Sequence, residues 1–157
     1  MRDSAPRSVE ALVEVAAEAN VRILLENLPY RIDPPHVYPL ISMAQLRTFI
    51  EPYPAEQIGL VVDVGHAWTA GIDPVVEIET AGDRLWGTHL QDVDADQPND
   101  DHWVPTHGGL NWPAICDALR RINYAGAWTF EVLNERRGES REQLATQSRA
   151  VAAEWGL

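Results

Sequence analysis

The chain has 157 residues, of which 45% are hydrophobic, and a formal net charge of −12 at pH 7. This length fits one domain of roughly 100–200 residues, and the apolar share supports a packed core, which argues against a disordered acidic tail. All twelve basic residues are arginine, so phosphate loops of the GKS type, Schiff-base lysines and lysine general bases are excluded. The acidic charge argues against a nucleic-acid partner, because a basic face supplies most of the affinity for nucleic acid.

The single cysteine, Cys116, excludes a disulfide framework and a multi-cysteine zinc site, and it fits a reducing compartment. The N-terminal stretch MRDSAPRSVE has no apolar signal core. No apolar run approaches the ~20 residues that a membrane span requires. We therefore expect a cytoplasmic protein with no membrane partner.

Short apolar runs alternate with amphipathic stretches from the start of the chain. Residues 8–19 place apolar side chains at helical spacing with acidic residues on the other face, which predicts a helix. The apolar, β-branched run at 21–27 is typical of a parallel strand covered on both faces. Ser42 is then expected to cap a helix over 43–51.

The middle of the chain continues this alternation. The run at 58–63 predicts a second buried strand, which ends in an acid. Asp73, followed by a proline, predicts the start of a helix over 74–82. Residues 84–89 predict a third strand, which ends in a histidine.

The last third of the chain adds one strand and two helices. A long polar loop, 90–110, leads to a helix expected over 112–122. The run at 127–132 predicts the fourth strand, and a final helix is expected over 141–155. The caps expected for these two helices are Asn111 and the Ser140–Gln143 capping box.

Four strands that alternate with helices predict a parallel α/β architecture with right-handed crossovers. In such folds the C-terminal ends of the strands share one face, which carries the active site. Each predicted strand has a residue of metal-binding type at this end: Glu26, Asp63, His89 and Glu131. Carboxylates crowded together in a low-dielectric site repel one another, and the chain has no lysine, so the sequence predicts a divalent metal. Oxygen-rich ligation with one nitrogen favours Mn²⁺ or Mg²⁺, with Co²⁺ or Zn²⁺ as alternatives.

Further polar residues are expected just beyond the strand ends. His66 follows Asp63 by three residues, so it either reaches the same opening or caps the start of a helix. Asp100 and His102 lie in the loop 90–110, where side chains are either solvated or bind ligands. No chemistry is assigned to the acids of the first part of this loop, Asp92, Asp94 and Asp96, which are expected to be solvated.

The tryptophans are expected to fall into two groups. The packing group is Trp86, Trp128 and Trp155. The group expected near the opening, where an indole could stack on a sugar ring, is Trp68, Trp103 and Trp112. No phosphate cradle is visible in the sequence, and the arginines that could contact a phosphate are Arg31, Arg136 and Arg137.

Taken together, these motifs resemble the sugar phosphate isomerase/epimerase family of xylose isomerase-like TIM barrels, a superfamily that also contains nucleases of the endonuclease IV type. The matching segments, in order, are LLENLP, VVDVGHA, THLQD, DDHWVPTHGGLNW and AGAWTFEV. Their order and spacing match the C-terminal half of the (β/α)₈ barrel, and the resemblance covers nearly the whole chain. It implies one such domain over residues 1–157, incomplete at its N-terminus.

The resemblance also implies roles for individual residues. The four strand-end residues named above match the family's four ligands to one divalent metal. Glu26 and Glu131 match the pair of glutamates that exchange protons on opposite faces of the substrate in its epimerases. His66 matches a histidine that contacts a substrate oxygen, and we assign His102 to substrate binding as well. Asp100 and His102 match an Asp-x-His pair that binds extra metals in the nuclease branch.

These roles predict a metal-dependent isomerase or epimerase of a sugar-like hydroxy-ketone. The metal would act as a Lewis acid and stabilise an enediolate while one glutamate removes a proton and the other returns one. Three alternatives stay open: a dehydratase of the same superfamily, a nuclease, and a catalytically inert module that binds metal or sugar. The charge of −12 argues against the nuclease.

The length of the chain raises a further question. A complete (β/α)₈ barrel takes ~250 residues, whereas this chain accommodates four strand–helix units. Four parallel strands alone leave two open edges and an uncovered inner face. The chain is therefore expected to be a fragment that lacks the N-terminal half-barrel, to close as a homodimer, or to be an inactive remnant.

Overall fold

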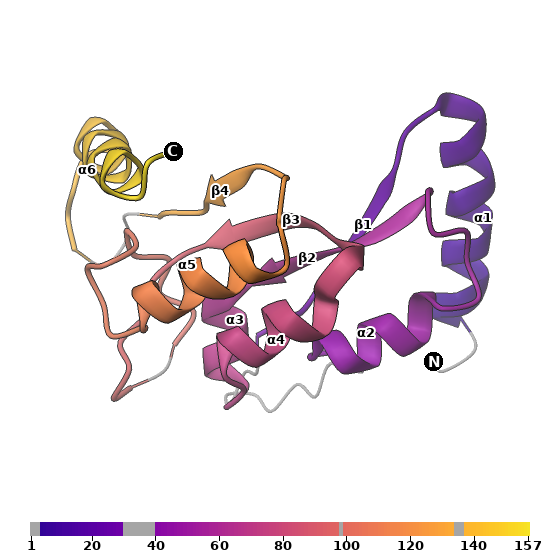
Figure 1. Ribbon diagram of the computed structural model, residues 1–157, viewed down its shortest axis with the longest axis horizontal. Helices are drawn as coiled ribbons and strands as arrows, with labels where there is room; N and C mark the ends of the chain where they lie inside the picture. Colours follow the sequence, from indigo (N-terminus) through magenta and orange to yellow (C-terminus); the bar gives the residue numbers. More distant parts are fainter. Residues whose placement is uncertain (1–3, 30–39, 98, 134–136) are drawn as a thin grey trace.

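The computed structural model describes residues 4–29, 40–97, 99–133 and 137–157, and four parallel strands form its sheet in the order β1-β2-β3-β4 (Figure 1). The strands are β1 Ile23–Glu26, β2 Ile58–Asp63, β3 Leu85–Leu90 and β4 Trp128–Phe130. The helices are α1 Ser4–Ala19, α2 Met43–Ile50, α3 Val64–Thr69, α4 Pro74–Ala81, α5 Trp112–Arg121 and α6 Arg141–Glu154, with a 3₁₀ turn at Gly82–Arg84. The expected parallel α/β architecture is confirmed.

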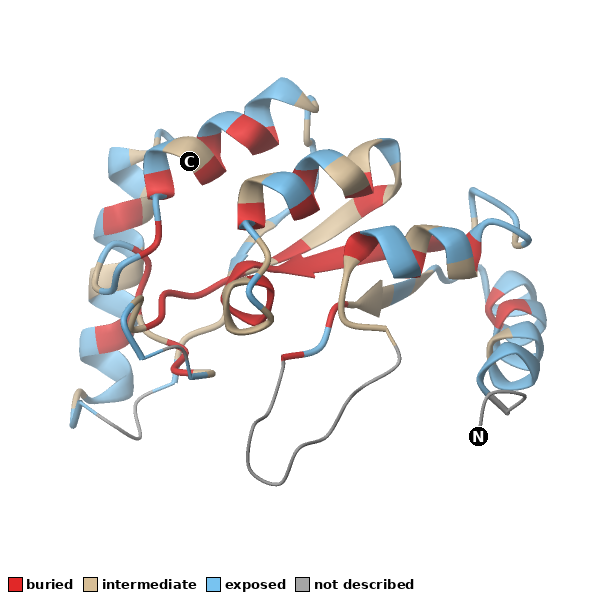
Figure 2. Cartoon of the chain, turned by 90° about the horizontal axis from the view of Figure 1, so that it is seen from below, coloured by how far each residue is buried: buried red, intermediate tan, exposed pale blue. Residues whose placement is uncertain are grey.

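One face of the sheet carries the hydrophobic core. Ile58, Leu60 and Val62 alternate along β2 and are fully buried, because their side chains point toward the helices. Helices α2, α4 and α5 lie along this side of the sheet (Figure 1). Their buried residues face it and their exposed residues face outward (Figure 2). A continuous cluster of aliphatic side chains therefore fixes the strands against these helices.

The register of the strands determines which residues share the opposite face. Glu26 pairs with Val61, Asp63 pairs with His89, and His89 pairs with Thr129. Paired residues point to the same face of a sheet, as do residues two apart along a strand. By this rule the ends of β1, β2 and β3 bring their polar side chains onto the face away from the helices.

That second face lacks the helical cover of the first in the described part of the chain (Figure 1). Leu24, on this face of β1, is 43% exposed. Beside it, Leu12 and Val15 on α1 are more than half exposed, as is Val21 just before β1. The β1 edge of the sheet and its neighbouring helix thus present apolar surface that a complete barrel would cover.

The observed elements follow the expected ones within a few residues, with one additional α-helix besides the 3₁₀ turn. The expected caps Ser42, Asp73, Asn111 and Ser140 each accept a backbone N–H at the start of their helix. The additional element is α3, which begins directly after β2. Asp63 caps it by accepting the His66 N–H at 2.7 Å, so one residue both ends a strand and starts a helix.

Two smaller differences affect the ends of the strands. β3 extends to Leu90, so His89 lies within the strand, while β4 ends at Phe130 and Glu131 follows it directly.

The first helix begins at Ser4 rather than at residue 8. Among the described residues, no helix is long and apolar enough to cross a membrane.

Candidate metal centre

The four residues predicted at the strand ends converge in the structure. Glu26, Asp63, His89 and Glu131 each offer one ligand atom, and these atoms all lie within 4.8 Å of one another. His89 is central: its Nδ1 lies 3.0 Å from Glu26 Oε1 and 2.7 Å from Glu131 Oε2. We call these four residues the strand-end cluster.

The backbone around Asp63 is fixed by an amide that the sequence analysis did not single out. Asn27, directly after β1, donates from Nδ2 to the Asp63 carbonyl at 2.9 Å and accepts the Asp63 N–H at 2.8 Å. Both residues are fully buried. This pair of hydrogen bonds ties the end of β1 to the end of β2 through the backbone of Asp63, so its side chain is not needed for that connection.

Burial divides the cluster into one anchored ligand and three accessible ones. Asp63 has no exposed side-chain surface, whereas the side chains of Glu26, His89 and Glu131 are 29%, 31% and 39% exposed. Burial raises the pKa of Asp63 to about 6, although His66 and Gln91 act in the opposite direction. The side chains of the two glutamates and His89 therefore face solvent, with Asp63 behind them.

The chemistry of the strand-end cluster fits a divalent cation. Three carboxylates and one imidazole form an oxygen-rich donor set of the kind that binds Mn²⁺ or Mg²⁺. Glu131 Oε2 is buried and accepts no well-aligned hydrogen bond, although His89 Nδ1 lies close by. A hydrogen bond to Glu26, with the charges of the surrounding acids, raises the pKa of His89. Three carboxylates gathered around one imidazole are a concentration of negative charge that a bound cation would neutralise.

A second cluster lies against the first and consists of His66, Asp100 and His102, whose ligand atoms also lie within 4.8 Å of one another. Asp100 Oδ1 is 3.3 Å from His66 Nε2 and 3.0 Å from His102 Nε2. Burial on its own lowers the pKa of His66, but Asp100 and Asp63 outweigh it and raise that pKa to about 9. The pKa of His102 is also raised. Burial alone would lower it, but the hydrogen bond and the charge of Asp100 outweigh burial.

The carboxyl of Asp100 shows the converse effect. Burial alone would raise its pKa, but hydrogen bonds from His102, His66 and Gln91 hold the pKa well below the usual range. Asp100 therefore lies as a carboxylate between two imidazoles whose pKa values it raises. A cation at this second cluster would compete with the protons that Asp100 favours on these rings.

The two clusters are in direct contact. His66 Nδ1 lies 3.4 Å from Glu26 Oε1, and His102 Nδ1 lies 3.8 Å from Glu131 Oε1. The Nδ1 atoms also face backbone carbonyls, that of Asn27 at 2.8 Å for His66 and that of Glu131 at 3.2 Å for His102. The structure thus brings His66 and His102, the two residues assigned to substrate binding, next to the strand-end cluster. The Nδ1 atom of each ring lies near a glutamate carboxylate and a backbone carbonyl.

The loop that carries Asp100 and His102 is organised by Asp92, to which the sequence analysis assigned no chemistry and a solvated position. That expectation is wrong for Asp92, which is fully buried. Its carboxylate accepts four hydrogen bonds, from Val93 N, Gly108 N, Leu110 N and Trp112 Nε1. Four donors compensate the cost of burying this charge.

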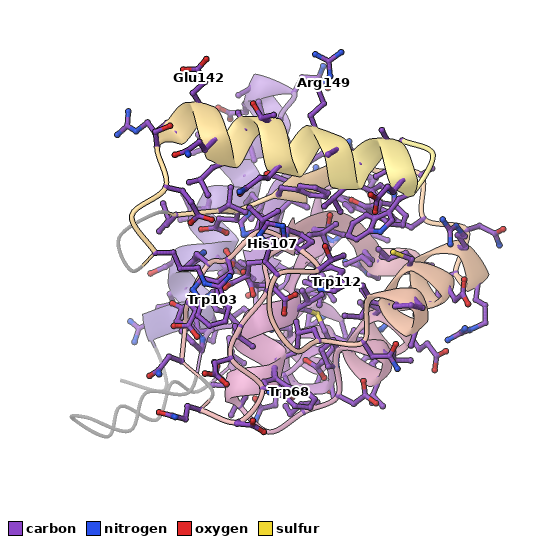
Figure 3. The ribbon with its side chains drawn as sticks, turned by 90° about the vertical axis from the view of Figure 1, so that its left-hand side faces the viewer. Trp68, Trp103, His107, Trp112, Glu142 and Arg149 are labelled. Carbon is purple, nitrogen blue, oxygen red and sulfur yellow. The ribbon has the colours of Figure 1, made fainter. Side chains whose placement is uncertain are left out.

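Two of the three tryptophans expected near the opening, Trp68 and Trp112, pack elsewhere. Trp112 is 3% exposed and stacks on Trp155 with ring centroids 5.2 Å apart, so it packs inside the molecule. Trp68 packs against the hydrophobic core. Trp103 lies beneath the guanidinium of Arg137, which is 3.7 Å from its ring centroid. Figure 3 shows the three indoles at separate places.

The tryptophans expected to pack and the arginines expected to contact a phosphate lie in different surroundings. Trp128 and Trp155 pack against the core as predicted. Trp86 lies under the guanidinium of Arg22 at 4.7 Å. Arg31 and Arg136 lie outside the described residues.

Comparison with known proteins identifies one family. The profile described as xylose isomerase-like TIM barrel matches residues 2–155. A D-psicose 3-epimerase of Enterocloster bolteae is 28% identical over 130 residues, which cover 83% of this chain and 40% of that protein.

Solved structures show the same arrangement of strands and helices. An L-ribulose 3-epimerase matches 99% of this chain and 55% of its own, with a TM-score of 0.80 and 24% identity. A D-tagatose 3-epimerase-like protein matches 98% of this chain and 53% of its own, with a TM-score of 0.79 and 22% identity. The chain therefore has the fold of part of a barrel and spans about half the length of these structures.

Proposed function

The chain belongs to the xylose isomerase-like TIM barrel family, and from this membership we propose that it supplies the metal-binding part of a sugar isomerase or epimerase. The observation that carries the proposal is the convergence of Glu26, Asp63, His89 and Glu131 within 4.8 Å. The names of its relatives, which include a D-psicose 3-epimerase and an L-ribulose 3-epimerase, support a ketose as the substrate.

The two glutamates are suited to proton transfer on opposite sides of a substrate. Glu26 comes from β1 and Glu131 follows β4, and these are the two outer strands of the sheet. Their side chains are accessible and approach the cluster from its two ends. One carboxylate would remove the proton from the carbon next to the substrate carbonyl, and the other would return a proton to the opposite face.

The remaining cluster residues would position the substrate and the cofactor. A divalent ion, Mn²⁺ or Mg²⁺ by its donor set, held by the strand-end cluster would supply Lewis-acid polarisation of the substrate carbonyl. Asp63, fully buried, would anchor this ion from behind. His66 and His102 would orient substrate hydroxyl groups from the side of the second cluster.

Other β/α units are needed to enclose such a site. The chain covers 53–55% of the structures described above, and the face of the sheet that bears the cluster is open beside Leu24. We propose that an N-terminal half-barrel, or a second copy of the chain, covers this face in the active protein. Size-exclusion chromatography with light scattering, with and without Mn²⁺, tests this, and a compact, active monomer would contradict it.

The catalytic proposal is tested by solvent deuterium exchange. The protein is incubated in D₂O with Mn²⁺ and each of D-psicose, D-tagatose and L-ribulose, and deuterium in the ketose is followed by NMR. We expect the wild type to incorporate deuterium, and Glu26→Gln and Glu131→Gln each to lose about 10²–10⁴-fold in exchange rate. Full exchange in both variants would rule out the two-glutamate assignment.

The same experiment separates the other reactions considered. Loss of water from the substrate, seen by mass, would indicate a dehydratase instead. Metal binding without deuterium exchange in any ketose would indicate a binding module.

A further inference from the structure

One buried amide connects the two clusters. Gln91 is fully buried and follows His89 by two residues. Its Nε2 lies 3.2 and 3.1 Å from the two carboxylate oxygens of Asp63 and 3.0 Å from Asp100 Oδ1. Its Oε1 accepts the backbone N–H of His102 at 2.8 Å. Each N–H of the amide can thus serve one carboxylate while its oxygen serves the loop.

The orientation of this amide is set by its surroundings. Oε1 must face the His102 N–H, because only an oxygen can accept that hydrogen, and Nε2 must therefore face the two carboxylates. Gly65, which follows β2, leaves the space for the side chain. A Cβ at that position would lie 2.6 Å from Gln91 Cδ and 2.8 Å from Oε1. Any side chain larger than that of glycine at position 65 would therefore displace the Gln91 amide.

The contact with His102 matters because its backbone is in a costly conformation. His102 has φ of +53°, in the left-handed region that a residue other than glycine seldom adopts. A hydrogen bond to its N–H helps to hold this conformation. The imidazole of His102 reaches Asp100 from this backbone position, so Gln91 contacts two of the three members of the second cluster, Asp100 and His102.

We propose that Gln91 is a positioning residue, which orients the Asp63 carboxylate for the cation and holds the second cluster in place against the strand-end cluster. The inference rests on the proposed function, since it assigns a cation to Asp63. Hydrogen bonds to a ligand carboxylate restrict the directions in which its oxygens can face a metal. Without the amide, Asp63 would lose the donor that contacts both of its carboxylate oxygens, and Asp100 would lose one of its donors.

The variant Gln91→Met tests this proposal, because methionine keeps the length of the side chain and removes both polar groups. We expect Mn²⁺ affinity, measured by isothermal titration calorimetry, to fall by about 10–100-fold. The visible d–d absorption of bound Co²⁺ is expected to change as well, because Asp63 adopts a different geometry. Gln97→Met, at an exposed glutamine of the same loop, is the matched control and is expected to bind both ions like the wild type.

A second variant keeps the test decisive should Gln91→Met fail to fold. Gly65→Ala retains the amide but displaces it, and we expect the same direction of change in Mn²⁺ affinity. Gly59→Ala, which crowds Trp86 near the other end of β2, controls for overpacking and is expected to lower stability without changing affinity.

The outcomes separate this inference from the proposed function. Wild-type affinity and an unchanged Co²⁺ spectrum in Gln91→Met or in Gly65→Ala, with only the urea midpoint lowered, would show that Gln91 merely fills space and would overturn the inference. Absence of Mn²⁺ binding by the wild type would overturn the proposed function, and this inference with it.

Discussion

The strand-end cluster and the second cluster lie in contact, but they are built in different ways. Glu26, Asp63 and His89 occupy the ends of regular strands, where the register places them on one face. Asp100 and His102 lie in a long loop whose position depends on backbone N–H groups that donate hydrogen bonds to the buried side chains of Asp92 and Gln91. Strand-borne side chains therefore need only the sheet, whereas loop-borne side chains need a polar network of their own.

This difference predicts which kinds of substitution would disrupt each cluster. The sheet beneath the strand-end cluster is held by many aliphatic contacts, so its position does not depend on any single one. The loop depends on the buried carboxylate of Asp92 and the buried amide of Gln91, each of which makes several hydrogen bonds. Removal of either group leaves buried polar groups unpaired, which is costly.

The largest effect on stability is expected from Asp92→Asn. The substitution turns an NH₂ group toward at least one of the four donors that now face the carboxylate. We expect a loss of about 3 kcal/mol in the free energy of unfolding, measured by urea denaturation. Asp96→Asn, at an exposed position of the same loop, should change it by less than about 0.5 kcal/mol. Equal stabilities of the two variants would show that the loop does not depend on Asp92.

An intermediate effect is expected from Asp100→Asn, and it concerns charge rather than folding. The carboxylate of Asp100 opposes the effect of burial on His66 and His102, so its removal should lower the pKa of both imidazoles. The pKa of about 9 for His66 should fall measurably in an NMR titration of the metal-free protein. The pKa of His89 is raised chiefly by its hydrogen bond to Glu26 and not by Asp100. This imidazole therefore serves as the internal control. Unchanged values for His66 and His102 would contradict the assignment of their charge to Asp100.

The smallest effect is expected at Glu77, a buried carboxylate remote from both clusters, with Met43 N as a donor at 2.7 Å. Burial raises its pKa above 4.5, against the effect of that hydrogen bond. The stabilising contribution of the protonated form is therefore present below pH 4.5 and lost as the pH rises. Glu77→Gln, which retains an acceptor, should become progressively more stable than the wild type above that pH in urea denaturation. A difference that stays constant between pH 4 and 8 would contradict this.

Much of the fold and of the strand-end cluster could be predicted from the sequence. Apolar runs and helix caps located the strands and helices, and a parallel arrangement brought the residues at their ends together. Helix α3 was missed because no turn residue separates it from β2: Asp63 ends the strand and caps the helix.

The second cluster and its support were less visible in the sequence. Asp92 resembles the acids beside it, and only the fold shows that Gly108, Leu110 and Trp112 direct their N–H groups toward it. The prediction that Trp112 lies near the opening was wrong for the same reason. Its indole N–H is bound by Asp92, which is 20 residues away in the sequence. One signal was available for Gln91: it follows His89 by two residues, and such residues share a face of a strand.

The most direct test of the metal centre is a Mn²⁺ titration of the wild type beside Asp63→Asn and Glu131→Gln, followed by elemental analysis of the dialysed proteins. Our structure predicts one tightly bound ion at the four strand ends, with affinity at least about 10-fold weaker in each variant. His107→Ala, at a half-buried histidine of the loop that belongs to neither cluster, should leave the affinity unchanged. Equal binding by all four proteins, or none by the wild type, would contradict a cation held there.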